Sequence, residues 1–121
     1  MDSPVRGFSH VQLRVTDVDA SAAWYAAVLG VEPTVEPSGG NAVLLGNGGR
    51  YVVVIGGGRP EGAGGEVDHL AFAVGGRDAL AAWAESLAAA GIEHGGLVEA
   101  DEGLSIHLTD PDGLAVELIA P

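Results

Sequence analysis

The sequence predicts an α+β protein made of two tandem βαβββ modules, because the chain repeats itself. When it is shifted so that His10 meets His69, the segment HVQLRVTDVDASAAW (10–24) aligns with HLAFAVGGRDALAAW (69–83), and the matches include paired Asp and Trp residues. Near the end of each half, GRYVVVI (49–55) aligns with GLAVELI (113–119). Chance agreement in a chain rich in Ala and Gly explains matched alanines. It does not explain pairs of His, Asp and Trp at a single offset.

Each half has the pattern of a strand, a helix and three short strands, and the length favours a single domain over residues 1–121. The expected boundaries are module 1 at about 7–56, a linker at about 57–66 and module 2 at about 67–121. The glycine-rich linker has neither the GxGxxG spacing nor a helix pattern after it. It therefore predicts no nucleotide site.

The first module begins with a strand that has two different faces. Apolar and polar residues alternate over 10–15, and the apolar positions should pack against a helix. Asp17 or Asp19 is the expected N-cap of that helix, which should span about 19–29 with Gly30 at its C′ position. The segment GNGG (46–49) predicts a tight turn between the third and fourth strands.

The second module repeats this order. In VDHLAFAV (67–74) the bulky apolar residues share one face, which should be the helix side. The following helix has an apolar stripe that ends at Gly91, and DPDG (110–113) predicts a second tight turn. The stripe consists of Leu80, Trp83, Ala84 and Leu87. Trp83 matches Trp24 in the repeat, and both are expected in the core.

Three polar residues fall on the opposite, free side of these strands. By period-two alternation His10 opposes the apolar face of the first strand, and His69 lies with Ala71 and Ala73 rather than with the bulky residues. Glu117 shares a face with Ala115 and Ile119 in the last strand. Neutral imidazoles suit Fe(II), Mn(II), Zn(II) or Ni(II), and a carboxylate adds an anionic oxygen ligand. A lone His in a strand is more often structural, but three such residues on equivalent faces of a repeated unit predict a metal site.

The same alternation places other polar residues on the free faces of the strands. Ser105 and His107 should face the free side, where His107 is either a general acid or base or an imidazole hydrogen-bonded at the rim. Gln12 and Arg14 extend the face of His10, and Arg14 is the cation that would steer an anionic substrate. Tyr51 and Val53 should share one face of their strand and are both candidates for substrate binding, with packing in the protein as the equal alternative for Tyr51. His94 is expected at the surface.

Composition excludes several classes of protein. The chain has a net charge of −12, with five Lys and Arg residues together against 17 Asp and Glu residues, so nucleic acid and anionic membrane surfaces are unfavourable partners. It has no Cys, which excludes disulfides and thiolate metal sites. The bases are all Arg, so a Walker-type loop and a Schiff base are excluded as well. Without a signal-peptide pattern or a long apolar run, a cytoplasmic protein is expected.

The chain from about Phe8 to Pro121 resembles the vicinal oxygen chelate superfamily, which includes glyoxalases, extradiol dioxygenases, fosfomycin resistance enzymes and bleomycin resistance proteins. The resemblance rests on HVQLRVTDVDASAAWYAAVLG (10–30), HLAFAV (69–74) and DPDGLAVELIAP (110–121). It implies a cup-shaped eight-stranded mixed sheet with helices outside and a divalent metal inside. Its metal ligands come from first and last strands of the modules, which is where His10, His69 and Glu117 stand.

The resemblance also narrows the type of site. Glyoxalases usually carry a Glu on the last strand of the first module, where the internal alignment puts Val53, so a four-ligand glyoxalase site is not expected. The His, His and Glu set is similar to that of extradiol dioxygenases and fosfomycin resistance enzymes. The latter need a basic pocket for a phosphonate, and this chain has no Lys.

Three functions are therefore open. The first is a metal-dependent enzyme acting on a small molecule that chelates through two adjacent oxygens, with Glu117 and His107 as catalytic candidates. The second is a metal-free protein that sequesters a cationic antibiotic, which the negative charge would attract. The third is a pseudo-enzyme with a regulatory role. The resemblance also implies a homodimer, since two-module members are often dimers. The metal site then either lies within one chain or takes His10 from one chain and His69 with Glu117 from the other.

Overall fold

The computed structural model describes residues 3–5, 7–35 and 40–121. The chain divides into two compact units, Met1–Glu61 and Gly62–Pro121, and each is described by itself. Their boundary falls inside the predicted linker. Each unit contains one helix and a four-stranded sheet among its described residues.

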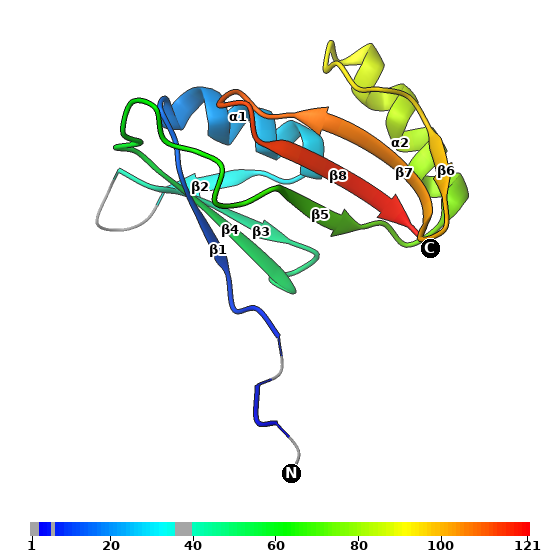
Figure 1. Cartoon of the computed structure of the whole chain (residues 1–121), viewed down its shortest axis with the longest axis horizontal. Coiled ribbons are helices and arrows are strands. Elements are labelled where there is room, and N and C mark those ends of the chain that lie inside the picture. Colours follow the sequence, from blue (N-terminus) through cyan, green and yellow to red (C-terminus); the bar gives the residue numbers. More distant parts are fainter. Residues whose placement is uncertain (1–2, 6, 36–39) are drawn as a thin grey trace. The chain divides into compact units, whose positions relative to one another are not determined.

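The first unit runs β1 (Val11–Arg14), α1 (Val18–Leu29), β2 (Pro33–Val35), β3 (Ala42–Gly46) and β4 (Tyr51–Gly56) (Figure 1). Its sheet has the order β1-β4-β3-β2, with β1 parallel to β4 and the other neighbours antiparallel. The first strand and the last strand of the unit therefore lie side by side.

The second unit repeats this topology with β5 (His69–Ala73), α2 (Arg77–Ala89), β6 (Val98–Ala100), β7 (Gly103–Thr109) and β8 (Ala115–Ala120). The sheet order is β5-β8-β7-β6, and β5 is parallel to β8. The predicted α+β class and the two βαβββ modules are confirmed. The strands form two four-stranded sheets, and the cup implied by the resemblance stays a prediction.

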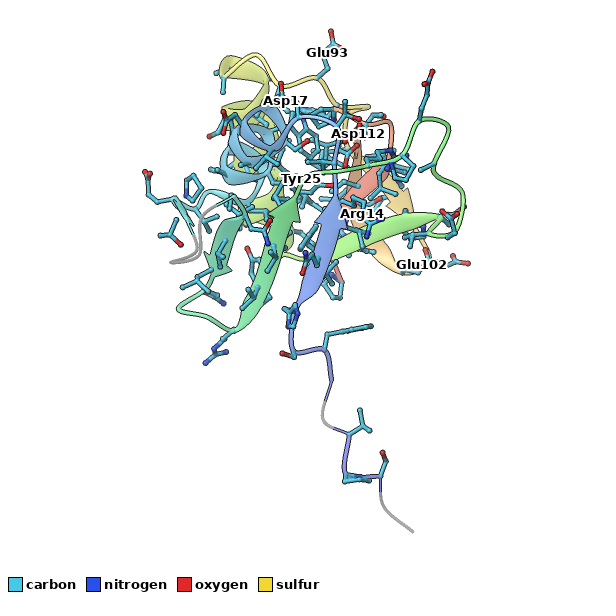
Figure 2. The ribbon with its side chains drawn as sticks, turned by 90° about the vertical axis from the view of Figure 1, so that its left-hand side faces the viewer. Arg14, Asp17, Tyr25, Glu93, Glu102 and Asp112 are labelled. Atoms are coloured by element: carbon cyan, nitrogen blue, oxygen red, sulfur yellow. The ribbon has the colours of Figure 1, made fainter. Side chains whose placement is uncertain are left out.

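Both ends of α1 have the expected capping residues. Asp17, labelled in Figure 2, has extended backbone. Its carboxylate accepts a hydrogen bond of 3.0 Å from the amide of Ala20. Gly30 ends the helix with φ 69°, and the next residue, Val31, donates its amide to the carbonyl of Ala26. Gly30 is favoured there because a side chain in the left-handed region is strained.

The core of the first unit differs from the prediction in one aromatic residue. Tyr25 is fully buried, whereas Trp24 is only half-buried and packs its ring edge-on against Tyr25 at 4.9 Å between centroids. The buried stripe of the helix runs through Ala22, Tyr25 and Val28, three residues apart, and Trp24 lies beside it. Val15, Leu44, Val53 and Ile55 form the sheet side of this core.

In the second unit the predicted stripe is largely correct. Leu80, Ala84 and Leu87 are buried, while Trp83 is half-buried. The sheet contributes Ile106, Leu108, Val116 and Leu118, each at most 3% exposed. At the end of α2, Ile92 donates its amide to Leu87 O and Gly91 donates to Ala88 O, which is the Schellman pattern.

We expect the Asp17→Ala variant to lose about 1 kcal/mol of the free energy of unfolding, because an amide of the first turn loses its acceptor. Asp19→Ala is the matched control, since it removes an acidic residue of the same turn that is not the cap; it should cost only about 0.3 kcal/mol. Urea denaturation followed by circular dichroism measures both. Equal losses in the two variants would contradict the assignment of the cap.

Candidate metal site

The free face of the second sheet brings three of the predicted site residues onto adjacent strands. Glu117 on β8 is paired with Ala71 on β5 and with His107 on β7. Residues paired across strands project to the same face, so Glu117 and His107 share a face, as do Ala71 and His69 two residues before it. The opposite face carries the buried apolar residues that pack on α2.

His69 and Glu117 approach each other on this face. The distance from His69 Nε2 to Glu117 Oε2 is 3.8 Å, and the Glu117 side chain is only 18% exposed. Two donor atoms that each lie about 2.1 Å from one ion are at most about 4.2 Å apart, so this spacing suits a shared divalent ion. The nitrogen and oxygen donors fit the metals that the sequence predicts.

The ring of His69 has a second polar neighbour. Its Nδ1 lies 2.7 Å from Oδ2 of Asp68, the residue before it. An ionised carboxylate only accepts hydrogen bonds, so the hydrogen of a neutral His69 belongs on Nδ1. This leaves the Nε2 lone pair on the side of Glu117, where a metal ligand needs it.

His107 contacts Ser105 on the same strand. Ser105 Oγ lies 3.4 Å from His107 Nε2, and Ser105 is buried while His107 is exposed. This contact gives the buried hydroxyl a partner, in line with the hydrogen-bonded alternative for His107. A role as general acid or base is a prediction that this geometry does not test.

The first unit carries the other predicted ligand. His10 precedes β1, is exposed, and has its Nδ1 3.0 Å from Ser9 Oγ. Gln12 and Arg14 follow on the same face of β1, both exposed, and Arg14 is labelled in Figure 2. A Cβ added at Gly56 would lie 3.3 Å from Gln12 Nε2, so this glycine leaves room for the amide.

The register corrects the expected placement of Tyr51 and Val53. Val53 pairs with Val11, just as Val116 pairs with Leu70, so Val53 is equivalent to Val116 and lies on the buried face. Tyr51 shares that face, because strand residues two apart point the same way. A role of either residue in substrate binding on the free face does not fit this geometry.

A difference in hairpin length explains why the sequence alignment matched Val53, rather than Val54, with Glu117. Between the paired residues Leu45 and Val52 the chain has six residues (46–51), whereas between the equivalent pair Thr109 and Ala115 it has five (110–114). An alignment anchored on the turn glycines therefore slips by one. The true counterpart of Glu117 is Val54, which also cannot bind a metal, so the first module still lacks this carboxylate.

Tyr51 instead has a structural role. It pairs with Gly46, and a Cβ at Gly46 would overlap the Tyr51 ring, so the ring lies over this glycine. Burial raises the pKa of the Tyr51 phenol above its usual value of 10.0, since phenolate is poorly solvated there.

The sequence did not reveal the partners of the imidazoles. His94, expected at the surface, is half-buried and places its Nε2 2.9 Å from Ala84 O, while its Nδ1 accepts from the amide of Gly96. It therefore ties the segment after α2 to that helix. Ser9 and Asp68 were missed as well, although the internal alignment places them at equivalent positions.

Among its described residues, neither unit holds a complete metal site. Within each unit, the described residues include no group of three or more His, Asp or Glu side chains that could hold a metal ion. His69 and Glu117 are therefore two candidate ligands, fewer than such a group requires. Over the same described parts of the chain, no helix is both long and apolar enough to span a membrane.

Comparison with known families decides the relationship. Residues 7–118 match the model of the Glyoxalase/Bleomycin resistance protein/Dioxygenase superfamily. The chain belongs to this superfamily. No curated protein sequence matches significantly.

Solved structures of the superfamily share this fold. A glyoxylase/bleomycin resistance protein/dioxygenase domain from Frankia sp. EAN1pec is 30% identical, with a TM-score of 0.77 over 96% of this chain and 92% of that one. The fosfomycin resistance protein FosX from Listeria monocytogenes is 24% identical, with a TM-score of 0.76 over 97% and 94%. Lactoylglutathione lyase from Agrobacterium tumefaciens is 18% identical, with a TM-score of 0.74 over 98% and 96%. The last two show likeness of fold alone.

We expect Tyr51 to lower the free energy of unfolding as the pH rises above about 10. The pKa of its phenol is raised in the folded state, so its contribution is present below about pH 10 and is lost as the pH rises through the folded pKa. Urea denaturation at pH 8 and pH 11 should show a smaller fall in unfolding free energy for Tyr51→Phe than for the wild type. An equal fall would contradict the effect of burial.

Proposed function

We propose that this protein is a metal-dependent enzyme that acts on a small substrate chelating through two adjacent oxygens. His10, His69 and Glu117 would be the ligands of a divalent ion, Fe(II), Mn(II), Zn(II) or Ni(II). The approach of His69 Nε2 to Glu117 Oε2 at 3.8 Å carries the proposal. The repeat supports His10 as the third ligand, because it occupies in the first module the position of His69 in the second.

The remaining residues have defined roles in this proposal. A bound ion would polarise a substrate oxygen and stabilise the charge that develops on it. Glu117, when it is not a ligand, would take a proton from substrate, and His107 on the neighbouring strand would donate or accept one. Arg14 and Gln12, exposed beyond His10, would bind polar or anionic groups of the substrate.

The reaction type follows from the metal. Iron would favour insertion of dioxygen, whereas Mn, Ni or Zn would favour isomerisation or addition at an oxygen-bearing carbon. We further propose a cytoplasmic homodimer. His10 then reaches the ligand pair of the second unit either within one chain or from the partner chain, as the sequence predicts.

Metal binding tests the proposal directly. His69→Ala and Glu117→Gln should each weaken binding of the purified ion by more than about 100-fold, since each removes a ligand rather than an outer partner. Equilibrium dialysis with elemental analysis measures the affinity and identifies the ion. Glu93→Gln is the matched control, because it removes an exposed carboxylate outside the set.

The His10→Ala variant distinguishes a site with three ligands from one that consists of His69 and Glu117 alone. A loss like that of His69→Ala supports the three-ligand site. Unchanged affinity in His69→Ala and Glu117→Gln would overturn it. Tight binding of a cationic antibiotic that a chelator does not affect would instead favour sequestration, which the net charge of −12 supports.

A further inference from the structure

Both predicted histidine ligands have the same arrangement of neighbours. In each case the side chain of the preceding residue lies within hydrogen-bond distance of Nδ1, at 2.7 Å for Asp68 with His69 and 3.0 Å for Ser9 with His10. The shift that aligns the two histidines also aligns Ser9 with Asp68. The contact therefore recurs at equivalent positions of the two modules.

Such contacts are unusual between consecutive residues of a strand. Successive side chains of a strand point to opposite faces, so residues i and i+1 do not meet inside one. His69 is the first residue of β5 and Asp68 precedes it, while Ser9 and His10 both precede β1. The contacts are possible because Ser9 and Asp68 lie before their strands, where side chains do not follow the alternation of a strand.

The two partners differ in chemistry. A carboxylate only accepts hydrogen bonds, so Asp68 holds the hydrogen on Nδ1 of His69 and leaves Nε2 free to bind a metal. The Ser9 hydroxyl both donates and accepts, so it orients the ring of His10 without selecting its tautomer. Metal-binding His residues are usually fixed by such an outer partner, often a carboxylate.

We propose that Asp68 and Ser9 are positioning residues for the two imidazoles, and that Asp68 selects the tautomer of His69 that binds metal through Nε2. This inference rests on the proposed function for its consequence, but the tautomer of His69 exists without any metal. The two ideas can therefore fail separately.

The first experiment uses the metal-free protein. Nitrogen-15 NMR of the imidazoles at about pH 8, where an ordinary imidazole is neutral, should show the His69 hydrogen mainly on Nδ1. Asp68→Ala should move the population toward Nε2–H, and Asp68→Asn should restore part of it because the amide oxygen accepts a hydrogen bond. Glu66→Ala is the control, since it removes an exposed negative charge nearby in the sequence without touching the ring.

The second experiment measures metal affinity of the same variants by equilibrium dialysis. Asp68→Ala should weaken binding about 10-fold, the lower end for loss of an outer partner, because the Asp68 side chain is 96% exposed. Asp68→Asn should recover part of that loss, and Ser9→Ala should have a smaller effect than Asp68→Ala. Glu66→Ala should match the wild type.

Each outcome has one meaning. An unchanged His69 tautomer in Asp68→Ala overturns the positioning role, whether or not the protein binds metal. A changed tautomer with unchanged metal affinity overturns its consequence for the site. A wild type that binds no metal overturns the proposed function but leaves the tautomer result standing, and a larger loss in Ser9→Ala than in Asp68→Ala overturns the assigned difference between the partners.

Discussion

The parallel pairing of β5 with β8 is the interaction on which the candidate site depends. It pairs Glu117 with Ala71, which lies two residues after His69 on the same face of β5. Because the side chain of Ala71 is small, it leaves room for the His69 ring and the Glu117 carboxylate to approach each other. A shift of one residue in this register would turn Glu117 toward the buried face, where an unpaired carboxylate is costly. The apolar residues Val116 and Leu118 on either side of it, which pack in the core, hold the register.

Strand register also explains why the two modules differ in the residues that could bind a metal. The first module has β1 parallel to β4 in an equivalent arrangement, but an extra residue in its hairpin moves Val54 rather than Val53 to the position of Glu117. A valine there supplies no ligand, so the first module offers His10 alone and the second offers a pair. The two modules thus have the imidazole in common, and only the second has the carboxylate.

The four histidines show how hydrogen-bond partners assign roles to one residue type. His94 uses both ring nitrogens to hold backbone groups, which leaves neither for a ligand. His107 contacts the buried Ser105. In His10 and His69 the side-chain neighbour is at Nδ1, so their Nε2 atoms are the ones suited to a metal.

The sequence by itself determined the class, the repeat and the faces of most strands, because helix and strand periods, caps and glycine turns are local properties. It placed His69 and Glu117 on the free faces of their strands for the same reason, because the alternation of side chains within a short strand does not depend on its pairing partner. Tertiary structure decided what depends on pairing between strands. Because the first hairpin is one residue longer, Tyr51 and Val53 lie on the face opposite to the predicted one. Packing of α1 on its sheet buries Tyr25 rather than Trp24. The contacts of Asp68 and Ser9 with the neighbouring imidazoles depend on the folded backbone before each strand.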